Sequence, residues 1–190
     1  NHTWVNGKCK YCGVSKKTAL GNENRKTELE THAYEWIHTD NPERLLNMKF
    51  DVIISNPPYQ LDDGGNGASA KPIYHRFIEQ AKKLNPRYLT MIIPARWYAG
   101  GKGLDNFRKS MLDDGQISHL VDYVNAKDCF PGISIGGGVC YFLRTKGYSG
   151  RCHYTNIHDG HTSTAIRRLN EYEAVSYTHL RAHETSLHLV

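Results

Sequence analysis

The sequence predicts an α/β fold built on a mostly parallel sheet with an antiparallel strand at its edge. Nearly continuous apolar runs at 50–54 and 88–93 have the composition of strands buried on both faces, as in parallel sheets. Between them, residues 72–84 carry apolar side chains at helical spacing, so that strand, helix and strand follow one another. The run 139–143 follows a turn of three glycines and is expected to form the antiparallel strand at the edge.

The remaining elements follow in order from local signals. Apolar residues at helical spacing over 29–37 predict a helix that ends before an Asn-Pro pair. Pro72 opens the second helix at the position that proline prefers, and Pro86 ends it. Residues 104–112 predict a third helix, and 117–124 predict the strand that pairs with the antiparallel one.

Composition narrows the class of protein. A chain of 190 residues accommodates one domain with a real core, or one domain and a piece of another. Its mean hydropathy is −0.60, no run approaches the 18 apolar residues of a membrane span, and no signal peptide opens it, so we expect a cytoplasmic protein without a membrane partner. Five irregularly spaced cysteines predict reduced thiols. A net charge of +5 permits a polyanionic partner without establishing one.

The motif Asn56-Pro57-Pro58-Tyr59 directly follows the first predicted strand, where open α/β sheets bind ligands. The exocyclic amine of a base or an amide is a poor nucleophile, and acceptors around it favour the partly positive nitrogen of the transition state. The Asn56 side chain and the Pro57 carbonyl are two such acceptors, on a backbone stiffened by two prolines. Tyr59 provides a flat surface for a planar substrate. The alternative is a rigid turn with a buried tyrosine.

Residues 50–60, FDVIISNPPYQ, resemble motif IV of amino-methyltransferases, and most closely that of the adenine-N6 DNA methyltransferases of restriction-modification systems. The resemblance implies a Rossmann-like S-adenosylmethionine-dependent fold. It also implies methyl transfer from S-adenosylmethionine to the N6 amine of an adenine flipped out of double-stranded DNA. Asn56 and Pro57 would accept from N6, Tyr59 would stack on the base, and Pro58 and Gln60 would border the pocket.

Four further residues are candidates for substrate contacts. Phe130 follows a predicted strand and would wall the base pocket, with Trp97 as a second candidate; both positions also suit a core aromatic. Arg96 and Lys102 follow the strand at 88–93 and would contact the phosphate backbone, although solvated surface residues are the alternative. No proline precedes any of the five cysteines, so a Pro-Cys nucleophile is absent and covalent catalysis is not expected.

The N-terminal segment contains Cys9-x-x-Cys12, which is half of a tetrahedral zinc site. His2, His32 and His38 are candidate completing ligands, and a stray pair of reduced thiols is the alternative. Zinc is therefore a candidate cofactor beside S-adenosylmethionine.

Nothing in residues 1–49 resembles the glycine-rich loop that holds the cofactor, so we expect that motif upstream. The chain is then expected to carry half of an active site, which need not be active alone. The expected organisation has four parts: a polar segment with the CxxC pair (1–27), the C-terminal half of a catalytic domain (28–146), the start of a target-recognition region (147–174), and a sequencing-adapter artefact (175–190).

Two other functions fit the same residues. One is an N-methyltransferase acting on an RNA base or a protein glutamine, since an amide presents Asn56 with the same chemistry. The other is a non-catalytic nucleic-acid-binding module that uses Cys9, Cys12 and the basic residues. For the restriction-modification function, the expected partners are double-stranded DNA and a fused or associated restriction nuclease.

Overall fold

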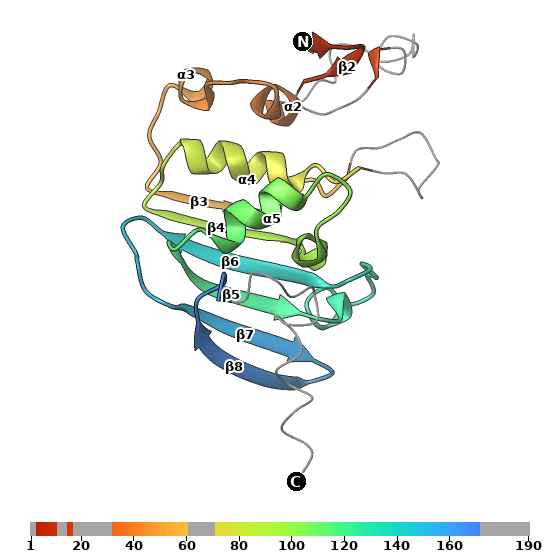
Figure 1. Ribbon diagram of the computed structural model, residues 1–190, viewed down its shortest axis with the longest axis vertical. Helices are drawn as coiled ribbons and strands as arrows, with labels where there is room; N and C mark the ends of the chain where they lie inside the picture. The colour runs from red at the N-terminus through yellow and green to blue at the C-terminus, as the bar shows by residue number, and fades with distance from the viewer. Residues whose placement is uncertain (1–2, 11–14, 17–31, 61–70, 172–190) are drawn as a thin grey trace.

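The computed structural model describes residues 3–10, 15–16, 32–60 and 71–171. A six-stranded sheet with the strand order β3-β4-β6-β5-β7-β8 forms its centre (Figure 1). Its strands are β3 (Val52–Ser55), β4 (Tyr88–Pro94), β5 (Ile117–Tyr123), β6 (Val139–Thr145), β7 (Cys152–His158) and β8 (His161–Arg167). A separate hairpin consists of β1 (Trp4–Val5) and β2 (Lys8–Cys9). The helices are α2 (His32–Ile37), α3 (Pro42–Leu46), α4 (Tyr74–Lys83) and α5 (Asp105–Leu112), with the 3₁₀ helices η2 (Ala95–Ala99) and η3 (Ala126–Asp128).

The sheet is mixed, which corrects the expectation of a mostly parallel one. β3 pairs parallel with β4 and β5 with β7, while β6 is antiparallel to both β4 and β5, and β8 to β7. The strand expected at the edge therefore lies inside the sheet, between β4 and β5. Its composition suits that place, because Cys140 and Phe142 are fully buried and it is paired on both sides.

Two strands that the sequence analysis did not anticipate extend the sheet beyond β5. β7 buries Cys152, Tyr154 and Asn156 and exposes residues between them, which is the alternation of a half-buried strand. An Asp-Gly pair at 159–160, both with positive φ, forms the tight turn into β8. These strands contain three histidines: His153, His158 and His161.

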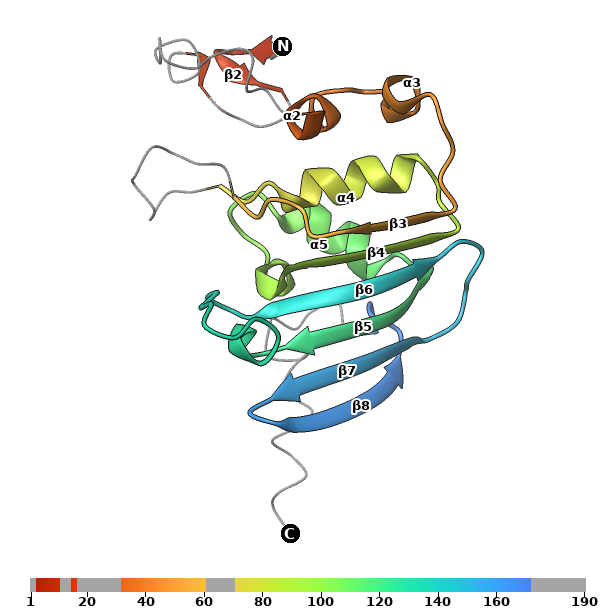
Figure 2. The ribbon, with the colours of Figure 1, turned by 180° about the vertical axis from the view of Figure 1, so that it is seen from behind.

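The main core lies between the sheet and the helices α4 and α5, which pack on one face (Figure 1). Seen from behind, the strands lie in front of α5, and no α-helix of the described ranges covers this second face (Figure 2). β4 contributes Leu89, Met91 and Ile93 to the core, and η2 contributes the fully buried Trp97 and Tyr98. Each such side chain stabilises the fold by about 1.5–3 kcal/mol, so this face carries most of the folding energy.

A buried glutamine joins the N-terminal helices to the core. Gln80 of α4 is 4% exposed, and its Nε2 donates to the carbonyl oxygens of Trp36 (2.8 Å) and Thr39 (2.5 Å), at and just beyond the end of α2. Ile37 packs beside these bonds in a small second core with α4. One of the last carbonyls of α2, that of Trp36, is therefore satisfied by α4.

No helix among the described ranges is long and apolar enough to cross a membrane.

An ionic cluster lies at the end of the sheet where β5 begins. Asp114 lies before β5, and its Oδ2 accepts from Lys82 of α4 at 2.8 Å and from Arg144 of β6 at 3.0 Å. Burial raises the pKa of Asp114, but the hydrogen bond and charge of Lys82, the Gln116 amide and the charge of Arg144 outweigh it and hold the pKa below its ordinary value. The cluster ties α4, β6 and the start of β5 together.

We expect Asp114→Asn to lower stability at neutral pH by about 2 kcal/mol or more, because two cations with little solvent exposure lose their counter-charge. The pKa of Asp114 is lower in the folded than in the unfolded chain. Its contribution is therefore present above pH of about 4 and lost as pH falls through the folded pKa. The free energy of unfolding, measured with urea from pH 2 to 7, should therefore fall less steeply at acid pH in the variant than in the parent. The control is Asp113→Asn in the exposed pair with Lys109, which should change the profile much less.

We expect Gly138→Ala to destabilise the protein by at least about 2 kcal/mol in urea unfolding. Gly138 has φ of +78°, and an added Cβ would lie 2.1 Å from the Tyr123 oxygen and 2.6 Å from the Val124 oxygen, both on backbone. The matched control is Gly136→Ala, where no atom lies within 4 Å of an added Cβ and φ is not positive. Equal stabilities of the two variants would contradict the prediction.

Candidate active site

The motif forms a corner at the carboxyl end of β3. β3 ends at Ser55, and Asn56 begins the corner beside the carboxyl end of the parallel strand β4. Neither proline has an N–H to donate, and each has a fixed φ, so the backbone leaves the sheet in one direction. The Ile73 amide, at the start of α4, donates to the Tyr59 carbonyl at 3.0 Å. The corner is thus held at both ends, by strand pairing and by this hydrogen bond.

Asn56 is exposed at this corner and is not turned into the core. Within the described part of the chain, no hydrogen bond occupies its side-chain amide. Its acceptor oxygen thus remains available to a ligand. Pro57, next in the chain, is buried and anchors the corner, whereas Pro58 is exposed.

Tyr59 is half-buried, with its ring packed against the main core. Its hydroxyl is buried and has no hydrogen-bond partner among the described residues. Burial raises the pKa of Tyr59 to about 12, and the nearby thiols of Cys129 and Cys140 add to the effect. The side chain is therefore neutral at physiological pH.

The structure brings the segment that carries Phe130 close to Tyr59. Cys129, the residue before Phe130, is one of the groups that raise the pKa of Tyr59. Phe130 is partly exposed and follows η3, where its amide donates to the Ala126 carbonyl at 2.8 Å. Its contact with a base stays a prediction. Trp97, by contrast, is fully buried and donates from Nε1 to the Cys140 sulfur at 3.4 Å, so its role is that of a core residue.

Arg96 and Lys102 are both exposed, Arg96 in η2 and Lys102 in the glycine-rich turn after it. Both follow the carboxyl end of β4, on the same edge of the sheet as the motif. The amide of Gly100 donates to the Trp97 carbonyl and that of Gly101 to the Asp105 carboxylate, so the turn uses these donors internally. Its role as a phosphate contact therefore depends on the two cationic side chains and stays a prediction.

Cys9 is buried at the end of β2, while Cys12 lies outside the described residues. Among the residues that the structure describes, no group of three or more histidine, cysteine or acidic side chains is placed to hold a metal ion. Cys9 and Cys12 as zinc ligands thus stay a prediction. His2 and the side chain of His32 are likewise outside what the structure describes.

A buried polar cluster behind the site was missed by sequence reasoning. Asp122 of β5 is fully buried, and its Oδ2 accepts from the Tyr154 hydroxyl at 3.1 Å and from Asn156 Nδ2 at 3.2 Å. It is paired in register with Cys140, which accepts from Trp97. The cluster thus joins β7 to the strands beside the site. An aspartate within the apolar run of β5 was the available signal.

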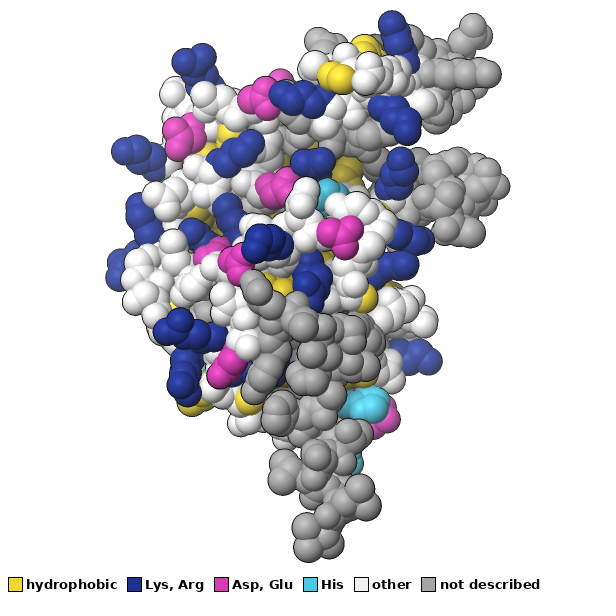
Figure 3. Space-filling model, viewed as in Figure 1, with side chains coloured by type: hydrophobic (Ala, Val, Ile, Leu, Met, Phe, Trp, Pro, Cys, Tyr) yellow, Lys and Arg dark blue, Asp and Glu magenta, His cyan; other side chains and the backbone are white. Residues whose placement is uncertain are grey.

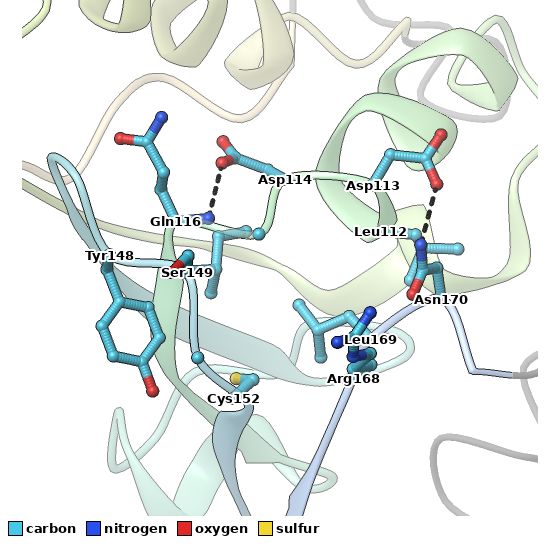
Figure 4. A pocket seen from close by; sticks show the side chains of 13 residues that line it. Leu112, Asp113, Asp114, Gln116, Tyr148, Ser149, Cys152, Arg168, Leu169 and Asn170 are labelled. Atoms are coloured by element: carbon cyan, nitrogen blue, oxygen red, sulfur yellow. Dashed lines mark hydrogen bonds between the residues drawn. The ribbon is translucent and has the colours of Figure 1, made fainter.

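Two cavities flank the sheet at different places. An apolar groove of about 450 Å³ lies along β3 and reaches Ser55, the residue before Asn56. A second cavity of about 270 Å³ lies between the end of α5, the loop before β7 and the residues after β8 (Figure 4). Its polar walls include Asp113 and Asn170, joined by a hydrogen bond of 3.5 Å. The second cavity adjoins the ionic cluster of Asp114, at the start of β5, and so is remote from the motif.

Lys and Arg side chains are spread over the face that carries α4 and α5, with fewer acidic ones among them (Figure 3). This distribution agrees with the net charge of +5. It gives the molecule a surface that attracts polyanions through long-range charge, without marking a single binding track.

Comparison with known proteins identifies the family to which the chain belongs. A model of the Eco57I restriction-modification methylase matches residues 2–130, which is more than half of the chain. A Mycoplasma pneumoniae (strain ATCC 29342 / M129 / Subtype 1) protein named "Uncharacterized adenine-specific methylase" is 39% identical over 153 residues, covering 75% of this chain. The chain spans 36% of that relative's length.

Among solved structures, a modification subunit of a putative type I restriction enzyme from Vibrio vulnificus YJ016 is 14% identical with a TM-score of 0.43. The matched region covers 77% of this chain and 34% of that subunit. A DrdV–DNA complex is 16% identical with a TM-score of 0.43, covering 73% of this chain and 17% of that one.

The family match includes the whole corner from Asn56 to Tyr59, which the fold holds at the carboxyl end of β3. The chain therefore belongs to the Eco57I restriction-modification methylase family.

Proposed function

We propose that the protein transfers a methyl group from S-adenosylmethionine to the N6 amine of an adenine flipped out of double-stranded DNA. The observation that carries the proposal is the exposed Asn56 on a proline-stiffened corner at the carboxyl end of β3. The family match supports methyl transfer in a restriction-modification system, and the relative's name supports adenine as the base.

Asn56 and Pro57 act on the amine through their oxygens. The lone pair of N6 is delocalised into the adenine ring, and attack on a methyl group makes this nitrogen pyramidal and partly positive. Acceptors that are fixed before the reaction stabilise this charge without reorganising. The corner meets this requirement because strand pairing and the bond from the Ile73 amide fix its two ends.

Tyr59 holds the flipped base by stacking. Stacking on an aromatic ring is worth about 1–3 kcal/mol per base, which offsets part of the few kcal/mol that flipping costs. Its pKa, raised to about 12, lies well above physiological pH, so the side chain is neutral beside Asn56. Phe130 is the proposed opposite wall, and Pro58 and Gln60 border the pocket.

The methyl donor needs a second surface that the described residues do not form. The turn after β3 is the proline corner itself, and the first two amides of the glycine turn at 100–103 are engaged within that turn. These residues do not fit a cofactor cradle of the strand, glycine turn and helix type. S-adenosylmethionine is therefore proposed from the family, with its binding residues outside the described part of the chain.

DNA and a restriction nuclease, fused or associated, are the proposed partners. The basic face and the exposed Arg96 and Lys102 support contact with phosphates. The family's restriction-modification role supports the nuclease and a cytoplasmic location, where the DNA of a prokaryotic cell lies.

Asn56→Ala in the intact methyltransferase should lower the methylation rate by about 10²–10³-fold, because one preorganised acceptor for the developing charge is lost. Transfer of labelled methyl groups to DNA measures the rate, and circular dichroism checks the fold. Asn106→Ala on the exposed side of α5 is the matched control and should keep the parental rate. Parental activity in the Asn56 variant would refute the assignment.

Tyr59→Phe should retain most of the DNA affinity and rate, because the hydroxyl has no partner among the described residues and the ring remains. Tyr59→Ala should weaken binding of the flipped base by about 1–3 kcal/mol, or roughly 5–150-fold. Titration of DNA that carries 2-aminopurine at the target position measures both variants. A loss in Tyr59→Phe as large as in Tyr59→Ala would show that the hydroxyl, not the ring, matters.

A further inference from the structure

The loop between β5 and β6 carries an apolar side chain into solvent at the edge of the sheet where the proposed base pocket lies. β5 ends at Tyr123 and β6 begins at Val139, and these two residues pair in register. Val139 also pairs with Pro94, at the carboxyl end of β4, so the loop emerges at the edge that carries the Asn56 corner (Figure 2). Within this loop, Ile133 is 52% exposed. A single exposed isoleucine is common on protein surfaces, so its position and support decide its meaning.

A tight turn joins Ile133 to Phe130, the proposed wall of the base pocket. The Ile133 amide donates to the Phe130 carbonyl at 3.1 Å, which closes a four-residue β-turn. Pro131 occupies its second position, and Gly132, with φ of +83°, occupies its third. This is the pattern of a type II turn, in which proline fixes one φ and glycine readily adopts the positive one. The turn holds the Cα atoms of Phe130 and Ile133 within about 7 Å of each other.

The two ends of the loop are also fixed to neighbouring elements. Before the turn, the Phe130 amide donates to the Ala126 carbonyl of η3 at 2.8 Å. After it, the Gly138 carbonyl accepts from the Ala95 amide, at the start of η2, at 3.0 Å. Ile133 therefore lies on a loop whose backbone is held at three places, although its side chain is exposed.

The surroundings of Ile133 suit a close approach to nucleic acid. Its exposed neighbours in the loop are small: Gly132, Ser134, Gly136 and Gly137. Residues 129–138 include no acidic side chain that would repel phosphates. An apolar side chain on such a loop can enter a stack of bases, as the apolar wedges of DNA-bending proteins do.

We propose that Ile133 enters the double helix beside the flipped adenine and fills part of the space that the base vacates. The inference rests on the proposed function, because it requires a base drawn out toward Tyr59 and Phe130. Flipping is costly because the base loses its pairing and its neighbours lose a stacking partner. An isoleucine in the gap leaves water and covers the exposed base faces, so it favours the flipped state. Its side chain forms no hydrogen bond to base edges, so it holds the DNA open without reading the sequence.

DNA that carries 2-aminopurine at the target position measures flipping by the intact methyltransferase, because its fluorescence rises when the base leaves the stack. We expect Ile133→Ser to lower the flipping equilibrium by about 5–10-fold, and Ile133→Leu to match the parent. Ile166→Ser, at a 58% exposed isoleucine on β8, is the control and should keep the parental signal. A parental signal in Ile133→Ser would overturn this inference alone. No rise with the parent would overturn the proposed function, and the role of Ile133 with it.

The rate of methyl transfer at saturating DNA separates contact with the base stack from a structural role of Ile133. On fully paired DNA we expect Ile133→Ser to lower this rate by about 5–10-fold. A mismatched target adenine is easier to extrude, so on such DNA the variant should stay within about twofold of the parent. An equal loss on both substrates would show that Ile133 supports the protein rather than the open DNA, and would overturn the inference. So would an unchanged rate on paired DNA.

Discussion

The corner from Asn56 to Tyr59 depends on one constraint, which is that its backbone is fixed before any ligand arrives. Parallel pairing of β3 with β4 fixes its start, and the hydrogen bond from the Ile73 amide to the Tyr59 carbonyl fixes its end. Two prolines between these points remove the donors and the freedom that would let the segment relax. An acceptor that must stabilise a transient positive nitrogen works only when it need not move. In the proposed function, this rigidity lets Asn56 stabilise the charge on the amine without moving.

The core beneath the corner supports this rigidity. Tyr59 packs its ring on a layer that contains Trp97 and Cys140, and Cys140 accepts the indole hydrogen bond of Trp97. On the next strand, Asp122 holds β7 through Tyr154 and Asn156. Polar groups buried in this way are stable only when they are paired, so they fix the relative positions of their strands. The ring of Tyr59, the proposed stacking surface, is thus tied to four strands of the sheet.

Sequence reasoning predicted the parts whose signals are local. The apolar run of β4, the helical spacing of α4 and α5, and the strand before the motif were all recognisable, and the structure confirms them within a few residues. The position of β6 was wrong because the choice of pairing partner depends on contacts between distant segments, which a run of apolar residues does not encode. β7 and β8 were missed because they are polar, although the Asp-Gly turn at 159–160 was a hairpin signal.

The site itself shows the same division between local and distant information. The nature of Asn56 and its place after a strand were predictable, but the partners of Tyr59 in the core were not, since Cys129 and Cys140 lie 70 or more residues away in the chain. The corner also supplies only part of what methyl transfer needs. In the proposed function it orients and polarises an amine, whereas proximity to the methyl group must come from a second surface. In the proposed function, activation of the amine and binding of the methyl donor are therefore separate tasks of separate segments of the polypeptide.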